Sequence, residues 1–157
     1  MRYIFLDIDG VLNNQAFLLA SDKNVDLTID ENAVKTLGKI CRKLKAKVVI
    51  SSAWRVGWNN GGPRTTRLRN LFAKYKIDVV GLTSTDTKFT RAEQIIMYVC
   101  DHFKCGDSWV AIDDEELYLS SRRFVKTDFY GEGLTMKHYK PIRDALKYTI
   151  KEEWTTN

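Results

Sequence analysis

Five short runs of the sequence are apolar without the regular alternation of apolar and polar residues that marks a sheet exposed on one side. Strands of this kind are typical of a parallel sheet covered by helices on both faces, and this pattern restricts the fold more than any other feature of the chain. The predicted strands are "YIFLD" (3–7), "KVVIS" (47–51), "DVVGL" (78–82), "WVAID" (109–113) and "RFVKT" (123–127).

Segments with apolar residues at helical spacing separate these strands. We predict helices over 29–44, 66–76 and 91–103, with capping boxes in "TIDE" (28–31) and "TRAE" (90–93) at two of their starts. Because strands and helices alternate, the chain should form a doubly wound α/β sheet with right-handed crossovers. A last helix is expected to have Pro141 near its start and one apolar face made of Ile142, Ala145, Leu146, Thr149 and Ile150.

The 157 residues suit one domain, so we predict a single domain over residues 1–157. No apolar run approaches the roughly 20 residues of a membrane span, and no signal peptide is recognisable, so we expect a cytoplasmic protein with no membrane partner. No obligate protein partner is evident. The cysteines are three in number and poorly spaced for zinc, and Cys41 reads as a core residue in a reducing compartment.

Acids and serines follow three of the strands directly. Asp7 and Asp9 end the first strand, and Asp113 and Asp114 end the fourth. Ligands of doubly wound sheets bind at the carboxyl ends of the strands, where converging carboxylates favour a hard divalent cation, and we predict Mg²⁺. For Asp114, which precedes "EELYL", capping of a following helix is an equal alternative.

Three motifs in order resemble the haloacid dehalogenase (HAD) superfamily of phosphohydrolases. "DIDGVLN" (7–13) is similar to its first motif, "VVIS" (48–51) to its second and "AIDD" (111–114) to its fourth. The resemblance covers roughly residues 1–135 and implies a HAD-type, Rossmann-like parallel sheet of about five strands without a large cap domain. "SSAWR", "TRAEQI" and "GEGLT" further resemble the small HAD domains of bacterial and phage RNA-repair proteins.

The resemblance also implies roles for the acids. Asp7 would be the nucleophile that forms an aspartyl-phosphate, and Asp9 the general acid and then the base that activates water. Mg²⁺ would bridge Asp7, the backbone carbonyl of Asp9 and Asp113, with Asp114 orienting that shell. Gly10 would let the chain turn sharply beside the phosphate and the metal.

The remaining phosphate-binding groups have alternatives. By resemblance Ser51 would hydrogen-bond a phosphoryl oxygen, although Ser52 is the candidate if the register shifts by one residue. The cation of the third motif is either Arg91 or Lys88. We favour Arg91, because a cation in the first turn of a helix opposes the helix dipole and such a broken local rule can mark a functional site.

The stretch from 55 to 67 is glycine-rich and basic, and we expect a mobile loop at the mouth of the site. Arg55 could hold phosphate with two parallel hydrogen bonds, or could be a surface charge. Trp54 reads as packing more readily than as a stacking platform for a base. Arg64, Arg67 and Arg69 could track a phosphate backbone, although a solvated loop leading into a helix is the simpler interpretation.

The substrate is the least determined property. The stretch "NNQAFLLASDKNVDLT" (13–28) suits a flap rather than a cap, so the site should be open, and by family analogy open sites suit macromolecular substrates. The net charge of +5 favours nucleic acid weakly. We predict a Mg²⁺-dependent phosphohydrolase acting on RNA or DNA ends, similar to a polynucleotide 3′-phosphatase. The alternatives are a small-molecule nucleotidase and a non-catalytic nucleic-acid-binding HAD module.

Overall fold

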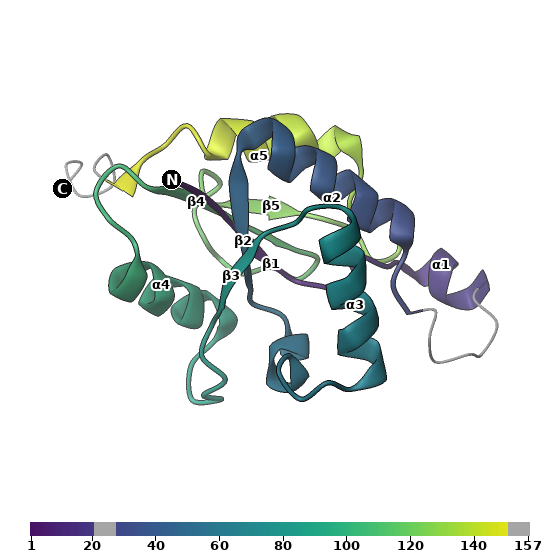
Figure 1. Cartoon of the computed structure of the whole chain (residues 1–157). Helices are drawn as coiled ribbons and strands as arrows, with labels where there is room; N and C mark the ends of the chain where they lie inside the picture. The colour runs from purple at the N-terminus through teal and green to yellow at the C-terminus, as the bar shows by residue number, and fades with distance from the viewer. Residues whose placement is uncertain (21–27, 151–157) are drawn as a thin grey trace.

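The computed structural model of the chain describes residues 1–20 and 28–150 and contains a five-stranded sheet in which every neighbouring pair of strands is parallel (Figure 1). The strand order is β3-β2-β1-β4-β5, which confirms the predicted doubly wound α/β fold. All five predicted strands are present, with ends within about two residues of the expected ones. The strands are β1 (Arg2–Leu6), β2 (Ala46–Ile50), β3 (Val79–Leu82), β4 (Ser108–Asp113) and β5 (Phe124–Lys126).

The central strand β1 lies between β2 and β4, where the chain reverses its direction of winding. Leu6, at the end of β1, pairs with Ile50 of β2 and with Ile112 of β4. The carboxyl ends of these three strands therefore meet at one edge of the sheet. In doubly wound sheets this switch point is the place where ligands bind.

Helices cover both faces of the sheet (Figure 1). One face packs against α2 (Glu31–Leu44), α3 (Pro63–Lys74) and α5 (Tyr139–Ala145), and the opposite face packs against α4 (Arg91–His102). The shorter helical segments are α1 (Gln15–Ala20) and the 3₁₀ turns η2 (Ala53–Gly57) and η3 (Met136–His138). None of the described helices has the length and hydropathy that a membrane span requires.

The two cores explain why the strands lack alternation. Ile4 and Leu6 of β1 point into the core under α2, α3 and α5, whereas Tyr3 and Phe5 point into an aromatic core under α4. Trp109 of β4 meets Phe5 edge to face, with the ring centroids 5.6 Å apart. Both faces of β1 are buried, so this strand holds whatever follows it in a fixed place.

Two helix starts differ in how well the sequence predicts them. At α4 the capping box is confirmed: Thr90 accepts from the backbone N–H of Glu93, and the Glu93 side chain accepts from the N–H of Thr90. At α2 the predicted box in "TIDE" is wrong. Asp30 is the N-cap and accepts from the N–H of Asn32, because its short carboxylate reaches the first turn directly.

The predicted last helix is also wrong in extent, because α5 ends at Ala145. The Tyr148 carbonyl accepts from the buried guanidinium of Arg123, and the Ile150 N–H donates to the carbonyl of Asp107. These contacts draw the chain away from the helix axis. Apolar spacing alone does not reveal them.

Two segments near the site have more structure than expected. The predicted loop over 55–67 is largely helical, since η2 occupies its start and Pro63 begins α3 at the first helical position. The predicted flap over 13–28 begins with α1, while residues 21–27 lie outside the described part of the chain. No cap domain occurs within the described residues, and the extent of a single domain over 1–157 stays a prediction.

Candidate active site

The switch point of the sheet gathers the polar residues that follow β1, β2 and β4. Backbone bonds continue the sheet beyond the strand ends, from the N–H of Asp7 to the carbonyl of Ile112 at 3.0 Å and from the N–H of Ser51 to the carbonyl of Leu6 at 3.0 Å. These bonds fix the first residue after β1 and the first residue after β2 relative to each other and to β4. The site is therefore built on rigid strands.

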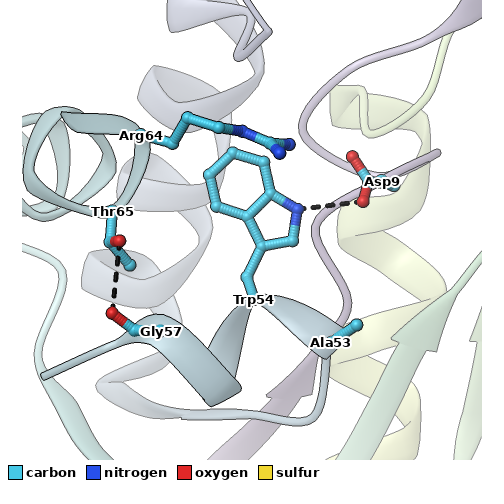
Figure 2. Close-up of a pocket in the computed structure, with 6 residues that line it drawn as sticks. All are labelled: Asp9, Ala53, Trp54, Gly57, Arg64 and Thr65. Atoms are coloured by element: carbon cyan, nitrogen blue, oxygen red, sulfur yellow. Dashed lines mark hydrogen bonds between the residues drawn. The ribbon is translucent and has the colours of Figure 1, made fainter. Parts of the chain in front are cut away.

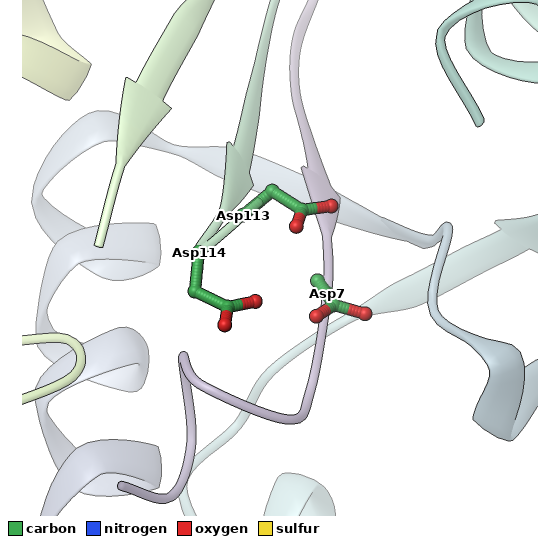
Figure 3. Close-up of side chains that lie close together, drawn as sticks. All are labelled: Asp7, Asp113 and Asp114. Carbon is green, nitrogen blue, oxygen red and sulfur yellow. The ribbon is translucent and has the colours of Figure 1, made fainter. Parts of the chain in front are cut away.

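Three carboxylates converge there (Figure 3). Asp7, Asp113 and Asp114 each offer an oxygen atom, and these atoms all lie within 4.8 Å of one another. Asp7 and Asp113 are buried and Asp114 is half-buried. Carboxylates this close are costly to bury without a compensating cation, and their oxygen atoms are the ligands that Mg²⁺ prefers.

The pKa values of these carboxyls reflect the crowding. Burial, followed by the charge of Asp113, raises the pKa of Asp7 to about 7, although Arg91 acts to lower it. Burial also raises the pKa of Asp113, and burial together with Asp113 raises the pKa of Asp114. Ionisation of all three carboxyls together is therefore unfavourable, and a divalent cation bound among them would lower these pKa values.

Arg91 supplies a cation beside the cluster. Its Nη1 atom lies 2.5 Å from Asp113 Oδ2 and 3.3 Å from Asp7 Oδ1. Burial alone would lower the pKa of Arg91, but the two carboxylates outweigh it and raise that pKa. Thr90 is the N-cap of α4, so its capping box makes Arg91 the first residue of the helix and holds it at this point.

Lys88, the other predicted cation, lies in the exposed turn before α4, where its N–H donates to Asp86. No ion pair joins Lys88 to another residue of the described chain. The structure thus brings Arg91, and not Lys88, to the carboxylates, and the role of either in binding phosphate stays a prediction.

Asp9 stands apart from the cluster, and its carboxylate is held by two donors. Trp54 Nε1 donates to Asp9 Oδ2 at 2.9 Å, and Asn13 Nδ2 donates to Asp9 Oδ1 at 2.9 Å. Asn13 also accepts from the N–H of Gly10 at 2.8 Å. The prediction that Asp9 contacts a metal through its backbone carbonyl is untested. Asn13 was missed because a lone asparagine after a turn carries no distinctive sequence signal.

Gly10 makes the turn between Asp9 and the rest of the loop possible. Its φ is +76°, and a Cβ atom there would lie 2.2 Å from the carboxyl carbon of Asp114. Its carbonyl accepts from the hydroxyl of Thr127 at 2.9 Å. A side chain at this position would displace an acid of the cluster.

The "GEGLT" segment supports the same loop from behind. The N–H of Leu134 donates to the carbonyl of Val11 at 2.9 Å. Gly133 has a φ of +62°, and a Cβ atom there would lie 3.0 Å from the carbonyls of Val11 and Asn13. The segment therefore packs its backbone directly against the turn that carries Asp9.

An inner cavity of about 330 Å³ opens beside these groups. Six of the nine lining residues are predicted site residues. The sequence did not indicate the other three, Ala53, Glu115 and Phe129. Glu115 follows the acid pair directly, which is the one signal that could have identified it. The lining residues are Asp7, Asp9, Gly10, Ser52, Ala53, Arg91, Asp114, Glu115 and Phe129.

Ser52, rather than Ser51, faces this cavity. The Ser52 side chain helps to hold down the pKa of the Asp7 carboxyl. Both serines are buried, but Ser51 does not line the cavity: its N–H donates to the carbonyl of Leu6 and its carbonyl accepts from Arg55. The structure therefore brings Ser52, and not Ser51, to the cavity, and a role of either hydroxyl in binding phosphate stays a prediction.

Arg55 links three segments around the site. Its guanidinium donates to the carbonyl of Ser84 at 3.0 Å, to the carbonyl of Ser51 at 2.7 Å and to Gln94 Oε1 at 2.8 Å. Burial, followed by the nearby charge of Arg91, lowers its pKa. These contacts favour a role in joining α4 to the turn after β2, and substrate contact by Arg55 stays a prediction.

An outer cavity of about 320 Å³ lies next to the inner one and shares Asp9 and Ala53 with it. Figure 2 shows Trp54 in its wall, with the indole N–H directed at Asp9 and Arg64 of α3 lying across the ring. The guanidinium carbon of Arg64 is 4.4 Å from the ring centroid. The other lining residues are Gly57 and Thr65.

Comparison with protein-family models gives a match over most of the chain. A family model described as the HAD domain in Swiss Army Knife RNA repair proteins matches residues 3–139, which is most of the chain. No curated protein and no solved structure gives a significant match.

Proposed function

The chain belongs to the HAD domains of Swiss Army Knife RNA repair proteins, and from this premise we propose that it is a Mg²⁺-dependent phosphohydrolase acting on phosphorylated ends of nucleic acids. The observation that carries the proposal is the buried acid cluster of Asp7, Asp113 and Asp114 beside Arg91, with Asp9 held separately at the same edge of the sheet. Two carboxylates in such different environments suit two different roles, nucleophile and proton carrier.

The residues of the cluster fit a magnesium ion. Three carboxylates face one guanidinium, and all of the offered side-chain ligands are oxygen atoms. Asp7, Asp113, Asp114 and the carbonyl of Asp9 would hold the ion. When bound, Mg²⁺ would offset the negative charge shared by the carboxylates and the phosphoryl group.

In the first step a carboxylate oxygen of Asp7 attacks phosphorus. The new oxygen–phosphorus bond forms as the bond from phosphorus to the leaving alcohol breaks, and Asp9 gives its proton to the alcohol oxygen. Arg91, which pairs with Asp7, and Ser52, which lines the same cavity as Asp7, would stabilise the phosphoryl oxygens.

In the second step Asp9, now a carboxylate, takes a proton from water. The water oxygen attacks phosphorus, the bond from phosphorus to Asp7 breaks, and inorganic phosphate leaves. Trp54 and Asn13 keep the Asp9 carboxylate in one orientation through both steps, so they are positioning residues for the proton transfers.

Within this class, the family description favours RNA ends, and we propose a 3′-phosphatase activity. The test is release of inorganic phosphate from a 3′-phosphorylated RNA oligonucleotide, its 5′-phosphorylated counterpart, a nucleoside 3′-monophosphate and a phosphopeptide. We expect the 3′-phosphorylated oligonucleotide to react fastest in Mg²⁺, with no reaction in EDTA.

Two variants control this test. Asp7→Asn should lose turnover by on the order of a thousandfold or more, since the nucleophile is gone. Asp101→Asn, at an exposed carboxylate on α4, should keep wild-type rates. Equal rates on mononucleotide and oligonucleotide would favour a small-molecule nucleotidase instead, and no turnover of any substrate would favour a non-catalytic binding module.

A further inference from the structure

The outer cavity lies where the alcohol half of a substrate must go. Asp9 lines both cavities, and in the proposed mechanism Asp9 protonates the leaving alcohol oxygen. A phosphate monoester seated against Asp7 in the inner cavity therefore directs its leaving group past Asp9. The next part of the substrate enters the outer cavity, between η2 and the start of α3.

Arg64 presents an available cation in that cavity. Its guanidinium packs on the face of Trp54, 4.4 Å from the ring centroid, and Trp54 is itself fixed by its bond to Asp9. Within the described part of the chain no carboxylate forms an ion pair with Arg64. Its five N–H donors stay available while the aromatic ring limits the freedom of the side chain.

The same geometry decides which part of a nucleotide fits. A contact of 4.4 Å leaves no gap in which a base could lie between the guanidinium and the indole ring. The edge of the guanidinium, by contrast, is free to form two parallel hydrogen bonds with an anionic oxygen pair. The other charged residue of the lining, Asp9, already accepts from Trp54 and Asn13.

We propose that Arg64, supported on Trp54, binds the phosphodiester adjacent to the phosphate monoester that is removed. The proposal rests on the proposed function and sharpens it, since it makes the preferred substrate a nucleic-acid end with at least one phosphodiester. A mononucleotide fills the inner cavity and leaves Arg64 without a partner.

The test compares substrates that differ only in that phosphodiester. Dinucleotides with a terminal 3′- or 5′-monophosphate are paired with the corresponding mononucleotides, and kcat/KM is measured for wild type, Arg64→Gln and Arg64→Lys. The matched control is Arg122→Gln, because Arg122 also stacks on an aromatic ring, that of Tyr148, but precedes β5 at the opposite edge of the sheet.

The wild-type enzyme should prefer the dinucleotide of each pair. Arg64→Gln should reduce that preference about tenfold, the effect of losing one exposed charge-assisted contact, and Arg64→Lys should reduce it less. Added salt should weaken the wild-type preference in the same direction. Arg122→Gln should keep the full preference.

Two results with the Arg64→Gln variant, and one with the wild type, would overturn the assignment. One is a preference that survives Arg64→Gln, and the other is an equal loss on both members of a pair, which would mean that Arg64 acts on Asp9 and not on the substrate. The absence of any preference for the dinucleotide in the wild-type enzyme would also contradict the assignment of Arg64.

A binding measurement separates this inference from the proposed function. Asp7→Asn protein, with and without Arg64→Gln, is titrated with each fluorescently labelled dinucleotide monophosphate. The inference requires about tenfold weaker binding when Arg64 is replaced, and unchanged binding contradicts it. The binding titration does not depend on catalysis. Absence of turnover by the wild type would therefore contradict the phosphohydrolase proposal and leave the Arg64 inference standing.

Discussion

At the scale of single residues, the site is organised by the contrast between two acids two positions apart. Asp7 is buried against Asp113 and Arg91, and burial with the charge of Asp113 raises its pKa to about 7. Asp9 is exposed and accepts hydrogen bonds from Trp54 and a loop asparagine. Ile8 between them is buried in the core. The chain after β1 therefore places the Asp7 carboxylate inside the site and the Asp9 carboxylate at its mouth.

The raised pKa of Asp7 predicts an effect on stability. Because the folded-state pKa of about 7 exceeds the ordinary 3.8, ionised Asp7 destabilises the folded protein, and this cost is fully present above about pH 7. Asp7→Asn should therefore raise the free energy of unfolding at pH 8, without divalent cations, by about 4 kcal/mol. Urea denaturation measures this, and the advantage should shrink as the pH falls from 8 to 5.

Asp9→Asn is the contrasting variant. Both carboxylate oxygens of Asp9 accept from N–H donors, so an amide would place its NH₂ group against one of them. This variant should gain no stability. An Asp7→Asn protein that is less stable than wild type at pH 8 would show that Arg91 and Ser52 compensate the buried charge fully.

At the scale of elements, the turn after β1 and the start of α4 set the positions of the acids and of Arg91 at the candidate site. The turn depends on Gly10, which approaches Asp114, and on the "GEGLT" backbone behind it. The start of α4 depends on the capping box of Thr90 and Glu93. The box holds a cation in a first turn where the helix dipole disfavours it by about 0.3–1 kcal/mol, and the paired carboxylates offset this cost.

The turn can be tested with two glycines of similar backbone conformation. Gly10 has φ +76° and its added Cβ would overlap the Asp114 carboxyl, whereas Gly61 has φ +67° and nothing within 4 Å of an added Cβ. Gly61→Ala should cost about 1 kcal/mol of stability from backbone strain alone and leave turnover intact. Gly10→Ala should cost more, and it should weaken Mg²⁺ binding because Asp114 must move.

The measurements are the urea midpoint and the shift in melting temperature on adding Mg²⁺. Gly61→Ala should keep the wild-type shift and Gly10→Ala should lose most of it. Identical behaviour of the two variants would mean that the approach of Gly10 to Asp114 has no bearing on the cation site.

At the scale of the whole molecule, the order of the strands matters more than any one helix. Since β1 is central and β4 joins it from the opposite side to β2, residues separated by about a hundred positions meet at one edge. Helices α2 and α3, from the β1–β2 and β2–β3 connections, cover one face together with α5, and α4, from the β3–β4 connection, covers the other. Arg91 reaches the site from the face that α4 covers. Arg64 and Trp54 come from the connection between β2 and β3.

The covering of the sheet predicts how the three thiols react. Cys41 of α2 is buried against the sheet, and burial raises the pKa of its thiol to about 12, whereas Cys100 and Cys105 are exposed. At pH 8 a disulfide reagent should modify two thiols rapidly and the third only as α2 separates from the sheet. Cys41→Ala should abolish the slow phase alone, and rapid modification of all three thiols in wild type would contradict this packing.

Sequence by itself determined the parallel sheet, its strand count and the gathering of acids at one edge. These features follow from local properties of the sequence. Runs of apolar residues form the strands, residues at helical spacing form the helices between them, and the acids follow the strand ends directly in the chain. Asp7, Asp113 and Asp114 therefore could be assigned to one place before any contact was known. The start of α4 at Arg91 was equally local, since its capping box spans four residues.

Only the tertiary structure decided which of two adjacent or alternative residues faces the site. Ser52 and not Ser51 lines the inner cavity with Asp7, and Arg91 and not Lys88 contacts the carboxylates. The donors to Asp9 and the early end of α5 were likewise set by contacts between segments far apart in the chain. The physical reason is the same in each case: a sequence pattern fixes the face of an element, but a hydrogen bond depends on the position of a partner that only the packed chain supplies.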